Sequence, residues 1–349
     1  MVGVQNRRGF QKVKLHVGKL APQVLTRLLS RLPRPSCVLV GPAYGEDAAA
    51  IALNDETIVV ASDPVTFATD LIGYYAVSVN ANDVAAHGAK PKYFLATILL
   101  PEGTDEIQVE QVFNQINESC AKIGVVLIGG HTEVTRSVNQ VVVSGCMIGE
   151  VKRGSLICTS GARVGDDIIL VGGIAIEGSA ILAREAKEDL KARGVPNDVL
   201  MRASQFLYSP GICVVNYAMS AMDVGGVTSM HDPTEGGLAM ALRELAAAAD
   251  VGIVIRRESI DILPECRVIC KAVGLDPLGL IASGSLLVVC DPAVTDRIVE
   301  PLRSFDISVS VIGRIVEKSC GVKFEDGEDV PIFERDEIAR YFEECYPTD

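Results

Sequence analysis

Three aspartates stand where a strand or helix is expected to begin or end, each among small residues or beside proline. Asp47 closes a Gly-Glu-Asp sequence, Asp63 lies within Ser-Asp-Pro, and Asp83 directly follows Asn82. Carboxylate oxygens are ligands that Mg²⁺ favours, especially where substrate phosphates complete its coordination. Any one of these aspartates could instead cap a helix or face water. Because all three share one local context, they predict a site for a hard cation.

Two glycine-bearing segments could present backbone N–H groups to a phosphate. The sequence Gly-Gly-His-Thr at 129–132 follows an apolar run and predicts a turn after a strand, and Asp-Pro-Thr-Glu-Gly-Gly at 232–237 leads into a predicted helix from Leu238. Glycine turns and helix N-termini both bind anions. The simpler alternatives are an Asp-Pro-Thr cap before a core helix and a His131 that only hydrogen-bonds its own loop. Carboxylates that hold Mg²⁺ beside N–H groups that hold phosphate are what phosphoryl transfer requires.

The elements that must position these residues alternate between strand and helix. Hydrophobic periodicity predicts a helix over 70–88 that carries Asp83 in its last part, and a helix over 238–249 after the second glycine segment. The predicted fold class is α+β, with two layers per domain and mixed sheets flanked by helices. A Gly-, Ser-, Lys- and Arg-rich stretch near residue 153 predicts two domains, 1–152 (with 1–15 as a flexible tail) and 153–349.

Length, charge and motif content exclude several classes of protein. A chain of 349 residues is too long for one ordinary core, and its net charge of −13 disfavours nucleic acid as a partner. The sequence contains neither an apolar run that could cross a bilayer nor a secretory signal, so we expect no membrane partner and a cytoplasmic location. Ten scattered cysteines form no C-x-x-C pair. No P-loop, dinucleotide fingerprint or G-x-S-x-G motif is present.

One segment runs against the acidic composition. Residues 1–45 contain eight Lys and Arg but no Asp or Glu. They could form a mobile basic tail before a helix with one solvated basic face. Alternatively, Lys19 or an arginine could reach a phosphate.

Five motifs together resemble the aminoimidazole ribonucleotide (AIR) synthase-related, PurM-like superfamily. That superfamily includes the hydrogenase maturation protein HypE, thiamine-monophosphate kinase, selenophosphate synthetase and a formylglycinamidine synthase. The likeness spans about residues 15–325 and is greatest to HypE, through Asp-Pro-Thr at 232–234 and Leu-Asp-Pro-Leu at 275–278. The motifs are Gly45–Ala49, Ser62–Pro64, Asn82–Ala85 with Gly88–Pro91, Gly129–Thr132 and His231–Gly237.

The resemblance implies a homodimer in which N-terminal strands form a shared β-barrel, with ATP and Mg²⁺ as cofactors bound in the N-terminal domain. Asp47, Asp63 and Asp83 would hold the metal, and four residues would be catalytic: Asp83, His131, Asp232 and Glu235. The residues expected to bind the nucleotide are Lys19, Asn82, Gly129, Gly130, Thr132, Asp232, Thr234, Gly236 and Gly237.

The sequence also departs from the family pattern. HypE proteins carry a terminal cysteine, whereas Cys345 is followed by four further residues, and His131 stands where relatives have aspartate. We therefore expect a HypE paralogue without the cysteine tail. Its function would be ATP- and Mg²⁺-dependent phosphoryl transfer to, or dehydration-type activation of, an oxygen or thiol acceptor on a small molecule or partner protein. The alternatives are a nucleotide-binding maturation, assembly or regulatory protein without turnover, and a thiamine-monophosphate kinase-like small-molecule kinase.

Overall fold

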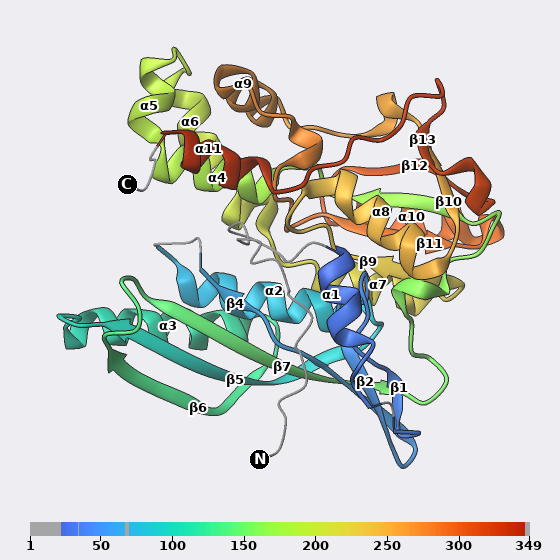
Figure 1. Cartoon of the computed structure of the whole chain (residues 1–349), viewed down its shortest axis with the longest axis horizontal. Coiled ribbons are helices and arrows are strands. Elements are labelled where there is room, and N and C mark those ends of the chain that lie inside the picture. The colour runs from blue at the N-terminus through green and yellow to red at the C-terminus, as the bar shows by residue number, and fades with distance from the viewer. Residues whose placement is uncertain (1–21, 34, 67–69, 346–349) are drawn as a thin grey trace, which may run out of the picture.

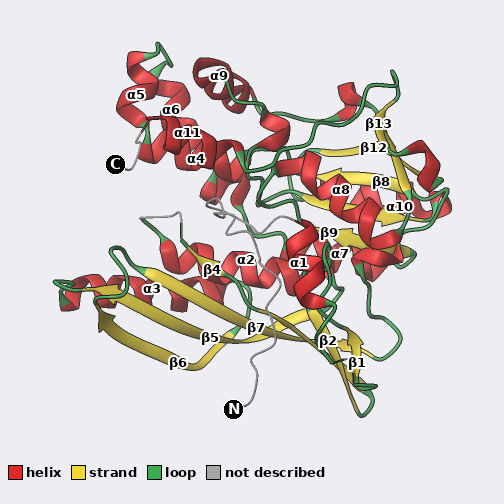
Figure 2. Cartoon of the chain, viewed as in Figure 1, coloured by secondary structure: helices red, strands yellow, loops and turns green. Residues whose placement is uncertain are grey.

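The computed structural model describes residues 22–33, 35–66 and 70–345. It consists of two β-sheets with flanking helices, stacked as a lower and an upper layer in Figures 1 and 2. The α+β class with mixed sheets is therefore confirmed. Lys19 and the predicted flexible tail lie outside the described residues.

The lower sheet has the strand order β1-β2-β3-β7-β5-β6, with β4 paired to β7. All pairs are antiparallel except β5 with β6. Strand β7 alternates between buried and partly exposed residues, as expected when one face packs on a core. The strands are β1 (Val38–Val40), β2 (Ala49–Leu53), β3 (Glu56–Ala61), β4 (Pro64–Val65), β5 (Lys90–Pro101), β6 (Val126–Thr135) and β7 (Val142–Lys152).

The upper sheet has the order β13-β10-β12-β8-β11-β9 and is antiparallel except for β10 with β13. Every residue of β11 is buried, because helices cover both faces of the central strands. The strands are β8 (Asp167–Val171), β9 (Val227–His231), β10 (Gly252–Ile255), β11 (Leu286–Cys290), β12 (Val309–Val316) and β13 (Val322–Phe324).

Helix α2 lies between the two layers and carries Asp83 (Figure 1). Nearly all of its residues are buried, which is the pattern of a helix enclosed on all sides. Small residues such as Ala81 and Ala85 leave room for both layers to approach it. The predicted helix over 70–88 is thus confirmed.

The remaining helices flank the sheets, with α4, α5, α6, α9 and α11 grouped at one end of the upper layer (Figure 1). No helix among the described residues is long and apolar enough to cross a membrane. The α-helices are α1 (Pro22–Leu29), α2 (Ile72–Ala86), α3 (Glu106–Lys122), α4 (Ile176–Glu185), α5 (Lys187–Ala192), α6 (Asn197–Ser204), α7 (Val215–Val224), α8 (Gly237–Ala249), α9 (Pro264–Val273), α10 (Thr295–Arg303) and α11 (Glu337–Cys345).

The predicted turn at 129–132 is wrong, because these residues lie inside strand β6. Gly130 pairs with Ala96 of β5, and a Cβ atom at Gly130 would come within 1.9 Å of the Ala96 carbonyl oxygen. This glycine therefore allows the two strands to approach closely, and the segment forms no phosphate-binding turn in this structure.

Candidate functional site

Four aspartates from four different segments converge between the layers. Asp47 lies in the loop from β1 to β2, Asp63 lies between β3 and β4, Asp83 lies in the last turn of α2, and Asp232 directly follows β9. One carboxylate oxygen each of Asp47 and Asp232 and a ring nitrogen of His231 lie within 4.8 Å of one another. The convergence brings the three predicted metal ligands together with Asp232, which the sequence predicted as a catalytic and nucleotide-binding residue.

Asp83 is the most deeply placed of the three predicted ligands. Its side chain is 5% exposed, and its buried Oδ2 atom has no hydrogen-bond partner among the described residues. Burial, followed by the charges of Asp232, Asp63 and Asp47, raises the pKa of Asp83 well above its ordinary value. A buried acceptor beside three like charges is costly without a counter-charge. This donor set therefore fits a hard cation such as Mg²⁺.

His231 connects the aspartate cluster to the upper layer through its two ring nitrogens. Its Nδ1 lies 2.8 Å from Asp47 Oδ2, and its Nε2 lies 3.1 Å from Glu244 Oε2. Burial disfavours the charged ring, but Asp47 and Glu244 outweigh it and raise the pKa of His231 well above its ordinary value. Both ring nitrogens of His231 thus lie within hydrogen-bonding distance of carboxylates, and the ring connects Asp47 to Glu244.

Glu46, next to Asp47, anchors the segment that links the two sheets. Its two oxygens accept hydrogen bonds from the backbone N–H groups of Thr159 and Ser160, each at 3.1 Å. His87 Nε2 lies 3.4 Å from Glu46 Oε2. Although burial opposes it, the contacts with His87 and Ser160 lower the pKa of Glu46. The lowered pKa keeps this glutamate ionised, and its hydrogen bonds connect the loop that carries Asp47 to the segment around Thr159 and Ser160.

Asn82, predicted to bind the nucleotide, is buried and hydrogen-bonded to the backbone through both ends of its amide. Its Nδ2 donates to the Ile212 carbonyl oxygen and its Oδ1 accepts from Val214 N–H, both at 2.8 Å. Asn80 similarly supports the aspartate cluster, because its Oδ1 accepts a hydrogen bond from Asp63 N–H at 2.9 Å. The two bonds of Asn82 fix the orientation of its amide and leave one N–H donor and one oxygen lone pair unused, so the nucleotide-binding role of Asn82 stays a prediction.

The 232–237 turn begins helix α8, as the sequence predicted, but part of its anion-binding capacity is already used. The N–H of Gly236 donates to Asp336 Oδ2 at 2.6 Å, and Oδ1 of the same carboxylate accepts from Ile338 N–H at 2.8 Å. A carboxylate from one hundred residues further along the chain therefore lies where the sequence predicted a phosphate. Thr234 and Glu235 are partly exposed, whereas Gly236 and Gly237 are buried.

His131 lies apart from these interactions on the edge strand β6. Its side chain is 65% exposed, and its ring contacts Glu133 at 3.4 Å. Gly129 and Thr132 belong to the same exposed strand. The structure thus does not bring His131 into hydrogen-bonding contact with the aspartate cluster, and its catalytic role stays a prediction.

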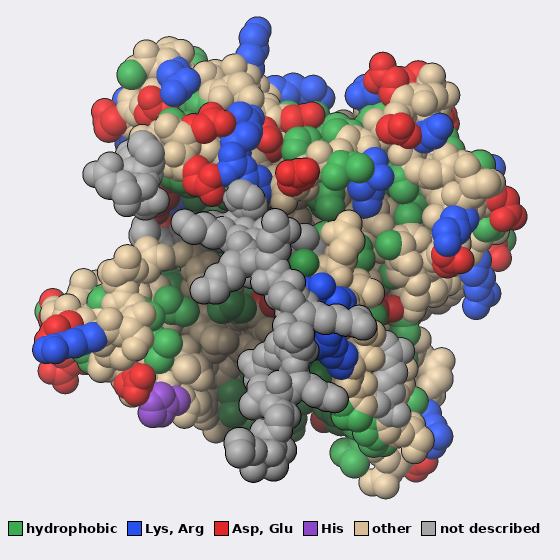
Figure 3. All heavy atoms as spheres, viewed as in Figure 1, with side chains coloured by type: hydrophobic (Ala, Val, Ile, Leu, Met, Phe, Trp, Pro, Cys, Tyr) green, Lys and Arg blue, Asp and Glu red, His purple; other side chains and the backbone are tan. Residues whose placement is uncertain are grey.

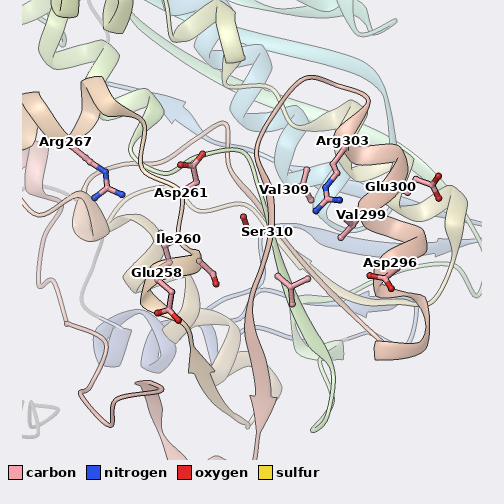
Figure 4. A pocket seen from close by; sticks show the side chains of 12 residues that line it. Glu258, Ile260, Asp261, Arg267, Asp296, Val299, Glu300, Arg303, Val309 and Ser310 are labelled. Atoms are coloured by element: carbon pink, nitrogen blue, oxygen red, sulfur yellow. The ribbon is translucent and has the colours of Figure 1, made fainter.

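A pocket among the described residues lies away from this cluster. It has a volume of about 970 Å³ and is bounded by the segment before α9, by α10 and by β12. Arg267 and Arg303 flank it, with Asp261 between them in Figure 4. None of the predicted site residues lines this pocket, so it provides no support for the nucleotide site.

Sequence reasoning did not assign roles to His231, Glu244 or Asp336. His231 enters the sequence analysis only as the first residue of the His231–Gly237 motif. Its partners lie 184 residues before it and 13 residues after it, and such pairs leave no local signal. The Asp-Pro-Thr motif directly after His231 was the one available indication of its importance.

Comparisons with known proteins agree with the fold. Residues 45–151 match the AIR synthase related protein N-terminal domain, and residues 163–325 match the C-terminal domain. The chain is 32% identical to a putative hydrogenase expression/formation protein of Methanocaldococcus jannaschii, over 80% of this chain and 82% of the relative. It is 31% identical to the carbamoyl dehydratase HypE of Cupriavidus necator, over 78% and 77%.

Solved structures show the same architecture. A chain of a HypE–HypF complex superposes with a TM-score of 0.71 at 24% identity, covering 84% of this chain and 94% of that one. The protein AaThiL, complexed with AMPPCP and TMP, superposes with a TM-score of 0.69 at 20% identity, covering 89% and 93%. Together with the two matched domains, these likenesses confirm the resemblance seen in the motifs: the chain belongs to the AIR synthase related protein family.

Proposed function

We propose that the protein is an ATP- and Mg²⁺-dependent enzyme that activates an oxygen or thiol acceptor by phosphoryl transfer or by a dehydration-type step. The observation that carries this proposal is the convergence of Asp47, Asp63, Asp83 and Asp232, with a buried Asp83 oxygen that lacks a hydrogen-bond partner. A bound Mg²⁺ would neutralise both the carboxylates and the nucleotide phosphates.

The chain's own residues would orient this site. His231 holds the Asp47 carboxylate, and Asn80 holds the backbone of Asp63. Glu46 holds the backbone of Thr159 and Ser160 through two hydrogen bonds. Positioning of this kind supplies much of the catalysis in phosphoryl transfer, because the phosphoryl group requires alignment and charge neutralisation.

Relatives support ATP as the nucleotide. A HypE structure is described in complex with ATP, and AaThiL in complex with AMPPCP. Relatives are named as carbamoyl dehydratases and as a thiamine-monophosphate kinase from Pyrococcus horikoshii, which is 29% identical over 85% of this chain and 88% of the relative. These different names leave the acceptor open, so the kinase-like alternative is kept.

Calorimetric titration with AMPPCP and Mg²⁺ tests the metal assignment. We expect saturable binding that weakens at least about tenfold, or about 1.4 kcal/mol, in Asp83→Asn. A matched control is Asp105→Asn, because Asp105 caps α3 on the surface and asparagine caps helices equally well. Unchanged, Mg²⁺-dependent affinity in Asp83→Asn would refute the assignment.

A second candidate function is nucleotide binding for assembly or regulation, without turnover. It is favoured by Asp336 occupying the Gly236 N–H and by the exposed position of His131. ADP release should be measured with thiamine monophosphate, formylglycinamidine ribonucleotide, selenide and a carbamoylated peptide. Release above background with any of these acceptors rejects the inert function.

We also propose a homodimer built on the lower sheet, with a shared barrel. Strand β6 is exposed along nearly its whole length, although it carries large apolar residues. Helices cover the other face of this sheet, and Figure 3 shows hydrophobic side chains at the surface of the lower layer. An exposed apolar edge strand is a liability unless it is covered. The large apolar residues exposed on the lower sheet are Leu39, Ile51, Leu53, Tyr93, Val126, Ile128 and Val134.

A further inference from the structure

A second buried acidic group lies apart from the four aspartates, where α4 begins. Glu177 is in the first turn of α4 and its side chain is 4% exposed. Its Oε2 atom is buried and has no hydrogen-bond partner among the described residues. Ser283 is the group that hydrogen-bonds this carboxylate. Native proteins rarely leave such an atom unsatisfied, and those that remain call for an explanation.

The surroundings of Glu177 are acidic. Burial, with added repulsion from Asp336 and Glu235 and despite the hydrogen bonds of Ser283, raises the pKa of Glu177 to about 7. Both oxygens of Asp336 are already engaged by backbone N–H groups. The unpartnered oxygen therefore lies in a negative field that repels anions and attracts positive charge.

Glu177 also lies between segments that build the aspartate cluster. Glu235, which faces it, follows Asp232 by three residues in the same turn. Tyr75, whose pKa the charge of Glu177 helps to raise, is on the helix that carries Asp83. Eight helical residues separate Tyr75 from Asp83, or roughly 12 Å along the axis. Through Tyr75, Glu177 is therefore close to the helix that carries Asp83, and through Glu235 it is close to the turn that carries Asp232.

We propose that Glu177 is the specificity-determining residue for the acceptor, binding a positively charged nitrogen group with N–H donors, such as an ammonium or amidinium, through its unpartnered Oε2. This inference rests on the proposed function, because it assigns the acceptor side of that site. An ionised carboxylate only accepts hydrogen bonds, so a cationic N–H group satisfies both its charge and its free oxygen. Since Glu177 is almost fully covered, binding includes a local opening of the covering segments.

Acetamidinium, acetamide and acetate form a matched set of probes, because they share one shape but carry positive, zero and negative charge. Saturation-transfer NMR on their methyl signals gives apparent affinities at constant ionic strength and pH 7.5. For the unmodified protein we expect acetamidinium to bind at least about tenfold more tightly than acetate and more tightly than acetamide. Equal binding of acetamidinium and either other probe overturns the proposal.

The variant Glu177→Gln keeps the shape of the side chain and removes its charge. We expect it to lose the preference for acetamidinium, whereas Glu185→Gln, an exposed substitution on the same helix, keeps it. A preference that persists in Glu177→Gln overturns the proposal. A change in the carboxyl ¹³C shift of Glu177 on adding acetamidinium to the unmodified protein gives a test that does not depend on how the variant folds; the absence of any change also counts against the proposal.

Titration with AMPPCP and Mg²⁺ separates this inference from the proposed function. If Glu177→Gln binds the nucleotide within about twofold of the unmodified protein, loss of acetamidinium selectivity is assigned to the acceptor side. If the unmodified protein selects acetamidinium but binds no nucleotide, the proposed function fails while the cation-binding role of Glu177 stands.

Discussion

The ring of His231 joins Asp47 of the lower layer to Glu244 of the upper layer, at 2.8 Å and 3.1 Å. The three side chains are nearly buried, and the histidine is flanked by two carboxylates. Its pKa is raised, so the proton on each ring nitrogen is held by an acidic partner. The contact therefore both stabilises the stacking of the layers and orients one of the candidate metal ligands.

Replacing His231 should cost much more stability than replacing an exposed histidine. His231→Gln leaves two nearly buried carboxylates without their shared cation, so we expect a loss of about 2–4 kcal/mol in the free energy of unfolding. Urea denaturation measures it. The control, His131→Gln, removes a histidine whose side chain is 65% exposed and should stay within about 0.5 kcal/mol.

A double-mutant cycle shows whether the pair is coupled. The variant Glu244→Gln removes one of the two carboxylates that face His231. If His231 and Glu244 interact, the double variant His231→Gln/Glu244→Gln loses less unfolding free energy than the sum of the losses in the two single variants. Strictly additive losses would show that the two side chains do not interact.

The three aspartates of the candidate metal site could be singled out from the sequence, whereas most of the contacts that support them could not. Asp47, Asp63 and Asp83 each lie in a short local motif, and local motifs are visible in a sequence. The contact of Asp336 with Gly236 spans one hundred residues and depends on how α11 docks, so no local pattern indicates it. The turn at 129–132 failed for another reason. Glycine after an apolar run usually ends a strand, but here it allows two strands to approach closely.

The variant Asn82→Ala tests whether Asn82, which family resemblance assigns to nucleotide binding, instead stabilises the fold. Asn82→Ala leaves the Ile212 carbonyl and the Val214 N–H without their partners in a buried place, so we expect a loss of about 2–4 kcal/mol in unfolding free energy. Chemical denaturation gives this loss, and calorimetry gives the affinity for AMPPCP. Both bonds are lost in either case, so the affinity decides: a nucleotide-binding role predicts weaker binding of AMPPCP in addition to the stability loss, whereas unchanged affinity assigns Asn82 to structure alone.

Glu177 should make stability fall as pH rises. Its pKa is raised from 4.5 to about 7 in the folded protein, so the native state binds more protons than the unfolded state between these values. Stability therefore decreases through this window and levels off above pH 7, by up to about 3 kcal/mol for this group. Asp336, whose burial raises its pKa to about 7, contributes a slope of the same sign.

Thermal unfolding between pH 4.5 and 8.5 checks this prediction. Glu177→Gln should match the unmodified protein near pH 4.5 and exceed its stability at pH 8, with part of the slope remaining because of Asp336. The exposed substitution Glu185→Gln should leave the slope unchanged. If Glu177→Gln is less stable than the unmodified protein at pH 8, the carboxylate is stabilised by contacts that outweigh its burial.

The proposed dimer predicts that charge on β6 separates the subunits without unfolding them. Ile128 is 53% exposed, so in an isolated chain aspartate there costs little, whereas in a dimer it would be buried against apolar residues. We expect Ile128→Asp to be monomeric by analytical ultracentrifugation at about 10 μM, with unchanged circular dichroism. Ile107 on α3 is 66% exposed, and Ile107→Asp makes the same chemical change on a helix that covers the other face of the sheet. The Ile107→Asp control should remain dimeric. If the unmodified protein is monomeric, the proposed dimer is excluded. If both variants dissociate equally, the subunit contact does not depend specifically on β6.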